Sequence, residues 1–270
     1  MGPATLSQHW VRTEFVDNAT KRQLKKQDQF VSMTEHGIAW AQNNRSRAIA
    51  YGVAVVVLIL AIIGGYKLYD YRSEAAQTAF GAAMQVYQTP LADSAQPLPP
   101  GMKSYPDVKT RAAAANAQFV QVAGQYGLTE SGRLAEYFAG LTYMEQGQNG
   151  PAEDALKKTA GSWDGGVAAL GKMALAGLYQ QTGRDQQAID LYNELSKGKA
   201  ATVPPGLAQI QLAELYQSQG KTEQARKIYA DLKENDKDAK GKPGAAAQVA
   251  TDKLNPKADA GPEAQYTKDK

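Results

Sequence analysis

LGKMALAGLYQQTGRDQQAIDLYNEL, residues 170–195, decides the fold of this chain, because two further stretches repeat its pattern. LAEYFAGLTYMEQGQNGPAEDALKKTA begins at Leu134 and LAQIQLAELYQSQGKTEQARKIYADL begins at Leu207, so the offsets are 36 and 37 residues. Five columns align: Gly140, Ala176 and Ala213; Tyr143, Tyr179 and Tyr216; Gly147, Gly183 and Gly220; Ala152, Ala188 and Ala225; and Leu156, Tyr192 and Tyr229. Self-similarity at such a period indicates an array of paired helices.

The residue types in these columns predict how the two helices of each unit, helix A and helix B, pack. The small residues of the first and fourth columns let helix A and helix B approach closely, and the tyrosines fill the space between them. The glycines of the third column follow helix A, where a left-handed backbone conformation suits glycine. Each pair buries its apolar face only against its neighbours, so several units must stack.

The columns resemble those of the tetratricopeptide repeat (TPR) family, which implies an all-α solenoid of about three full repeats. A split repeat is expected before them, with its helix A at Glu74–Gln88 and with Ala115 and Phe119 in its helix B. A proline-rich insertion over residues 89–107 separates these two helices. After the third repeat, Ala246, Ala247, Val249 and Ala250 predict a capping helix.

The stretch IAYGVAVVVLILAIIGGYKL, Ile49–Leu68, is apolar on every face and carries one charge, Lys67. A helix of about twenty residues covers about 30 Å, the thickness of the hydrocarbon core of a bilayer. We therefore expect a transmembrane helix over residues 48–69, continuous with the helix that begins at Glu74. Basic residues are more numerous before the stretch than after it, which predicts a cytoplasmic N-terminus and an external C-terminal domain over residues 70–254.

The two ends of the chain have their own expectations. Residues 1–47 form a head with the basic run KRQLKK at 21–26 and an amphipathic pattern after Asp28. Three interpretations stay open for it: a helix on the cytoplasmic leaflet, a docking helix for a membrane partner, or a plain lead into the span. Residues 255–270 are rich in Lys, Asp, Ala and Pro and are expected to be disordered.

The inward residues of the A helices choose the ligand in a TPR array, and the resemblance places a partner-binding groove on them. Carried over by position, the lining is Leu134, Tyr137, Leu141, Met144, Leu170, Met173, Gln180, Leu207, Ile210, Glu214 and Gln217. This lining is largely apolar and lacks the Lys and Arg clamp of carboxylate-binding TPR modules, so it suits an exposed hydrophobic segment or an amphipathic helix. The alternative is that the chain's own insertion or tail fills the groove.

The sequence offers no residues for catalysis, a cofactor or a metal. The chain has no cysteine, both histidines, His9 and His36, lie in the head, and phosphate-binding, hydrolase and zinc-protease motifs are absent. The net charge of +3 implies no nucleic-acid partner, and no small-molecule substrate is expected. The acidic cluster at residues 231–238 is interpreted as a solvated helix end, and Trp163 as a packed anchor rather than a sugar-binding platform.

A short head, one span and an external TPR array together resemble the bacterial YfgM-like TPR proteins, the ancillary Sec translocon subunits. That resemblance implies a non-enzymatic scaffold in the bacterial inner membrane with its array in the periplasm. Its expected partners are translocon subunits, periplasmic chaperones and newly exported proteins. The alternative is a structural adaptor for outer-membrane assembly, cell-wall synthesis or division.

Overall fold

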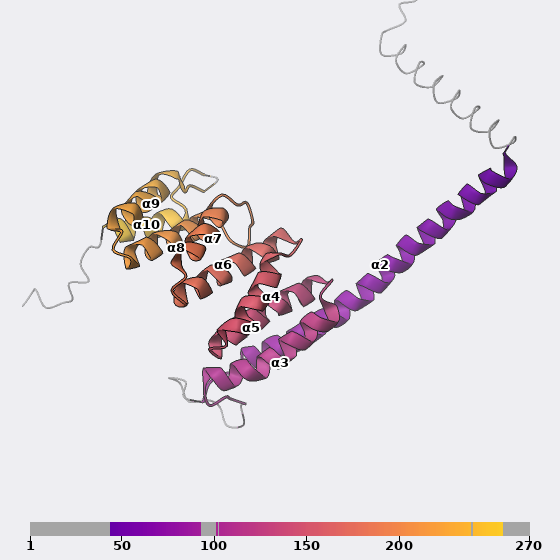
Figure 1. Cartoon of the computed structure of the whole chain (residues 1–270), viewed down its shortest axis with the longest axis horizontal. Helices are drawn as coiled ribbons and strands as arrows, with labels where there is room; N and C mark the ends of the chain where they lie inside the picture. The colour runs from indigo at the N-terminus through magenta and orange to yellow at the C-terminus, as the bar shows by residue number, and fades with distance from the viewer. Residues whose placement is uncertain (1–43, 93–100, 102, 239, 256–270) are drawn as a thin grey trace, which may run out of the picture. The chain divides into compact units, whose positions relative to one another are not determined.

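The computed structural model describes residues 44–92, 101, 103–238 and 240–255, and over these residues the chain is all-helical (Figure 1). The helices are α2 (Arg45–Tyr87), α3 (Val108–Tyr126), α4 (Glu130–Glu145), α5 (Asn149–Ala160), α6 (Gly165–Gln181), α7 (Asp185–Ser196), α8 (Pro205–Ser218), α9 (Thr222–Asn235) and α10 (Ala245–Leu254). The expectation of an all-α fold is confirmed. The expectations for residues 1–43 of the head and 256–270 of the tail lie outside the described residues.

The chain divides into two units, Met1–Lys67 and Leu68–Lys270, whose boundary falls inside α2. In the first unit, the described side chains from Arg45 to Lys67 are exposed. α2 is the one described helix that is long and apolar enough to cross a membrane. A core helix of comparable apolarity would be mostly buried. The prediction that one helix contains both the apolar stretch and residues 74–87 is confirmed.

In the second unit, α3 runs alongside the C-terminal part of α2 (Figure 1). An aromatic cluster joins this part of α2 to α3 and α4. Phe119 of α3 is fully buried, and its ring lies 5.8 Å from Phe80 of α2 and 5.3 Å from Phe138 of α4. Tyr87 also packs here and donates a hydrogen bond of 2.7 Å to Oε1 of Glu145. Burial, together with this carboxylate, raises the pKa of Tyr87 to about 12.

From α3 onward each helix packs against the next one in the chain. In addition, α4 contacts α6, and α8 contacts α10. The alanines of the predicted small columns are buried between these helices: Ala152, Ala176, Ala188, Ala213 and Ala225. Gly140 lies so close to α5 that a Cβ atom there would sit 2.6 Å from Cδ2 of Leu156. The predicted close approach of helix A and helix B is thus present.

The three glycines that follow α4, α6 and α8 share one backbone geometry. Gly147, Gly183 and Gly220 have φ values of 74°, 71° and 74°. In each turn the amide one residue after the glycine donates to the carbonyl of the aligned tyrosine, as Arg184 N does to Tyr179 O at 2.8 Å. This bond closes the helix end in the manner of a Schellman motif. The prediction of left-handed glycines at the ends of the A helices is confirmed.

Replacing Gly183 by alanine should destabilise the array by about 1–2 kcal/mol, because a left-handed conformation is costly for any residue with a Cβ atom. Nothing lies within 4 Å of the added Cβ, so the cost comes from the backbone alone. Gly183→Asn should cost less, since Asn tolerates this conformation better. Urea unfolding of the three proteins measures the difference, and equal stability of the alanine variant would contradict the assignment.

Capping residues set the bounds of α3 and α10. Oδ1 of Asp107 accepts a hydrogen bond of 2.7 Å from the amide of Thr110 and so caps α3. The described ends of the insertion meet where Tyr105 N donates to Pro90 O at 3.0 Å.

The predicted capping helix is present as α10. Oδ2 of Asp236 accepts from the amide of Ala247 at 2.9 Å, so this member of the acidic cluster is a capping residue rather than part of a solvated end.

Candidate protein-binding surfaces

The predicted groove residues lie on α4, α6 and α8, as the repeat alignment requires. Leu207 and Gln217 are exposed, and Ile210 is only 8% exposed. The other members are half-buried: Leu134, Tyr137, Leu141, Met144, Leu170, Met173, Gln180 and Glu214. The lining is therefore less open than a free groove would be.

Segments of the same chain cover part of this lining. Ile210 belongs to a buried cluster with residues of α9 and α10. Glu214 forms an ion pair of 2.9 Å with Lys253 of α10. Leu170 and Met173 belong to a cluster that also contains Ala200 and Val203 of the connection between α7 and α8. The covering segments are α10 and this connection, whereas the sequence had suggested the insertion or the tail.

Two surface hollows of similar size lie elsewhere on the array, and each is numbered by its repeat, the first or the third. Hollow 1, of about 440 Å³, is formed by α3, α4 and α5 and is lined by Val120, Ala123, Gly124, Glu136, Ala139, Tyr143, Pro151, Asp154, Ala155 and Lys158. Hollow 3, of about 430 Å³, is formed by α7, α8 and α9 and is lined by Asn193, Ser196, Gln209, Leu212, Tyr216, Gln224, Lys227, Ile228 and Asp231. Each lining residue of hollow 3 has a counterpart in hollow 1 that lies 73 residues earlier. The same surface feature therefore recurs in the first and third repeats.

The two hollows share an apolar floor and a polar rim. The aligned tyrosines Tyr143 and Tyr216 contribute to the floors, with small or aliphatic neighbours around them. Charged residues of both signs stand at the rims, such as Asp154 and Lys158 in hollow 1. A floor of this kind accepts an apolar side chain, and the rim offers hydrogen bonds to a peptide backbone.

An ion pair in the lining of hollow 1 recurs in the second repeat, with its charges exchanged. Nζ of Lys158 on α5 lies 2.5 Å from Oε2 of Glu136 on α4. One repeat later, Nζ of Lys172 on α6 lies 2.5 Å from Oε1 of Glu194 on α7. The sequence alignment missed this column because the residue types differ in sign, although the geometry is the same. The first and second repeats therefore present opposite charges at these two equivalent positions.

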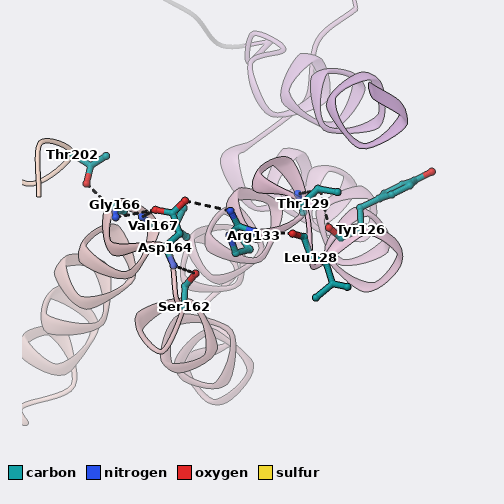
Figure 2. Close-up of polar contacts among 10 residues, drawn as sticks. Tyr126, Leu128, Thr129, Arg133, Ser162, Asp164, Gly166, Val167 and Thr202 are labelled. Carbon is teal, nitrogen blue, oxygen red and sulfur yellow. Dashed lines mark hydrogen bonds and ion pairs between the residues drawn. The ribbon is translucent and has the colours of Figure 1, made fainter. Parts of the chain in front are cut away.

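A third surface is formed by the loops that join α3 to α4 and α5 to α6, and Arg133 connects them (Figure 2). Its Nη1 donates a hydrogen bond of 2.8 Å to the carbonyl oxygen of Leu128, and its Nη2 lies 3.3 Å from Oδ2 of Asp164. The guanidinium carbon also lies 4.1 Å from the centre of the Trp163 ring, a cation–π arrangement. A single side chain thus holds two loops that are far apart in sequence.

Asp164 also begins α6, since its Oδ1 accepts hydrogen bonds from the amides of Gly166 and Val167 at 2.9 and 3.1 Å (Figure 2). The pKa of Asp164 is lowered from its ordinary value, first by the bond from Val167 and then by Arg133. A carboxyl group with a lowered pKa in the folded state contributes stability above its ordinary pKa. That contribution is lost as the pH falls through the lowered value.

Replacing Asp164 by asparagine should therefore cost about 0.5–1 kcal/mol at neutral pH, because the amide keeps the cap but loses the pairing with Arg133. As the pH falls below the ordinary aspartate range, the difference between the two proteins should shrink toward zero. Urea unfolding across a pH series measures this. A difference that stays constant down to strongly acidic pH would show that the charge of Asp164 contributes nothing.

The aromatic residue in this third surface does not behave as the sequence suggested. Trp163 is 77% exposed, so the interpretation of it as a packed anchor is wrong. Its flanking residues explain the outcome: Asp164 starts α6 and Ser162 accepts from the Asp164 amide, which leaves the ring outside the core. Leu128, 82% exposed, stands on the neighbouring loop. The two side chains border a small cavity of about 200 Å³.

Among the described residues, no group of three or more acidic or histidine side chains is placed to hold a metal ion. The surfaces described above offer apolar floors, rims of mixed charge and exposed apolar side chains, which are features of protein recognition.

Comparisons of the chain with family models, with curated proteins and with solved structures find no match in any of the three.

Proposed function

We propose that this chain is a TPR-type scaffold, held in a membrane by α2, that binds other proteins through its array. The left-handed glycines at equivalent helix ends and the buried small columns support the TPR assignment. The length and apolarity of α2 and its exposed surface from residue 45 to 67 support a single span. The charge bias of the flanking sequence supports a cytoplasmic N-terminus.

The observation that carries the binding proposal is the recurrence of one surface hollow in two repeats. Hollow 1 and hollow 3 are built from equivalent positions, with Tyr143 and Tyr216 in their floors. Two equivalent hollows suit a chain that presents apolar side chains at intervals, because each contact adds to the other through a raised effective concentration. The A-helix lining is the weaker candidate, since α10 and the α7–α8 connection already cover part of it.

The class of partner follows from this chemistry and from the resemblance to YfgM-like proteins. An extended client with exposed apolar residues fits a shallow floor with a polar rim better than a folded protein surface does. We therefore place the scaffold in the bacterial inner membrane, with its array on the periplasmic side. There it assists Sec-dependent export by holding newly translocated chains for translocon subunits or chaperones.

In-cell photo-crosslinking tests the proposal. A photoreactive amino acid is placed at Asp154 in hollow 1, at Lys227 in hollow 3 and at Gln217 in the A-helix lining, all of which are exposed. Gln181, which is exposed at the end of α6, is the control position. The expected result is adducts with newly exported chains, translocon subunits or chaperones at the two hollows, identified by mass spectrometry.

Three other results would change the conclusion. Adducts at Gln217 alone would move binding to the A-helix lining. Adducts with cell-wall or division proteins would favour the adaptor role. Equal yields at the hollows and at Gln181 would contradict specific binding by either surface.

A further inference from the structure

The most exposed large apolar side chains of the second unit gather at one end of it. Among the described residues from Leu68 to Asn255, Leu128, Trp163 and Tyr71 are 82%, 77% and 72% exposed. Leu68 follows at 61%, and the remaining large apolar side chains are 45% exposed or less. Exposed apolar residues scattered singly need no explanation, but a group of them marks an interaction surface.

Contacts within the unit connect Leu128 and Trp163 to the residues that immediately follow the apolar stretch. Arg72 donates a hydrogen bond to the carbonyl oxygen of Gln125, and its guanidinium carbon lies 5.6 Å from the centre of the Tyr126 ring. Leu128 comes two residues after Tyr126. Arg133 then joins the Leu128 carbonyl to the Trp163 ring, as described above. Both exposed side chains therefore belong to the end of the array at which the chain enters.

Chain length alone keeps this end near the boundary of the apolar stretch. Arg72 follows Leu68 by four residues of the same helix, which rise by about 6 Å. The headgroup region adds about 5–8 Å to each side of the hydrocarbon core. If α2 spans a bilayer, Arg72 and the residues that contact it are thus tethered within reach of the lipid headgroups.

We propose that Tyr71, Leu128 and Trp163 form a lipid-docking patch, here called the entry patch, that rests in the headgroup region of the bilayer. Aromatic rings are enriched at this level because one part of the ring is apolar and the other is polar. Arg133 covers one face of Trp163 and leaves most of the ring free. This inference rests on the proposed membrane anchorage and adds a second contact to it, which limits the rotation of the array about its tether.

The shape of the entry patch favours lipid over a small-molecule ligand and over a folded protein partner. The cavity between Leu128 and Trp163 holds about 200 Å³, below the usual size of a ligand site of about 300–1,000 Å³. Both side chains border this cavity and are still 82% and 77% exposed, so they protrude into solvent. A fluid bilayer accommodates protruding side chains without a complementary surface, whereas a folded partner needs one.

Quenching of Trp163 fluorescence by lipid tests the entry patch in the full chain. The other two tryptophans, Trp10 and Trp40, are changed to phenylalanine, and the protein is placed in phosphatidylcholine nanodiscs. A second preparation uses phosphatidylcholine brominated near the top of its acyl chains. Trp163 emission should fall about twofold in the brominated lipid, because an interfacial ring lies within contact of that level.

Two matched reporters, each in a Trp163→Phe background, separate the possible outcomes. Gln187→Trp reports from the first turn of α7, beyond the end of α6 that is remote from Trp163, where Gln187 is exposed, and it should not be quenched. Leu58→Trp reports from the middle of the apolar stretch and should be quenched by phosphatidylcholine brominated near the ends of its acyl chains. If Leu58→Trp is quenched and Trp163 behaves like Gln187→Trp, anchorage stands and the entry patch is overturned, which leaves the ring for a protein partner. If Leu58→Trp is not quenched, the anchorage itself is wrong.

Discussion

Replacing Gly171 by alanine should destabilise the array by about 3 kcal/mol, although the change adds a single methyl group. Gly171 is buried at the crossing of α6 and α5. A Cβ atom there would lie 2.5 Å from the amide nitrogen of Ala160 and 2.8 Å from the carbonyl carbon of Thr159. These are backbone atoms, which cannot rotate away as the end of a side chain can. The two helices must therefore separate, and the contacts around them are lost.

Gly177 on the same helix is the matched control. Nothing lies within 4 Å of a Cβ atom at this position. Gly177→Ala should therefore stabilise the array by about 0.5–1 kcal/mol, because alanine loses less backbone freedom than glycine on forming a helix. Urea unfolding of the full chain in detergent, monitored by circular dichroism, compares the stability of the two variants. A similar effect of both substitutions would show that α5 and α6 do not approach as closely as described.

Replacing Phe119 by alanine should cost about 3–5 kcal/mol, since it removes a fully buried ring and leaves a cavity. The ring contacts Phe80 and Phe138 and has an edge-on partner in Tyr87 at 6.1 Å. It is thus the common neighbour of α2 and α4. We expect the loss to fall first on the C-terminal part of α2, because terminal units of a repeat array depend on one neighbour only.

Hydrogen exchange of the full chain locates this effect. In Phe119→Ala the amides of residues 74–87 should exchange faster than in the unmodified protein, while those of α8 and α9 should change little. Phe119→Leu, which refills most of the space, should cost about 1 kcal/mol. Val120→Ala is the surface control, because Val120 is 43% exposed, and it should change stability by less than about 0.5 kcal/mol. Uniform loss of protection across all helices would contradict the local role of Phe119.

Much of the helical architecture could be predicted from the sequence because its causes are local. The columns that contain Ala176 and Ala188 mark the buried faces of helices by their spacing, and a positive φ at Gly183 follows from the residue type. The apolar stretch in α2 needs no tertiary contact to be recognised. The capping helix follows from its run of alanines and the insertion from its prolines, whereas the cap that Asp107 forms on α3 was found in the structure.

The candidate surfaces could be predicted from the sequence only in part, and Ile210 shows why. Its position in the repeat predicted an inward groove residue, yet α10 packs over it and buries it. A repeat pattern describes each unit against its neighbours, but the last unit has a capping helix in place of a neighbour. The pattern therefore assigns the register of Ile210 correctly while it leaves the occupant of that face undetermined.

By itself the sequence determined the helices, their repeat, the left-handed turns and the apolar stretch, since each depends on residues a few positions apart. Only the tertiary structure decided which polar and exposed groups meet. Arg133 reaches Asp164, 31 residues away, and its guanidinium lies over the exposed ring of Trp163. The two equivalent hollows likewise each need three helices in place. Such features depend on how successive units stack, and the stacking arises from close packing of many small side chains that no single column encodes.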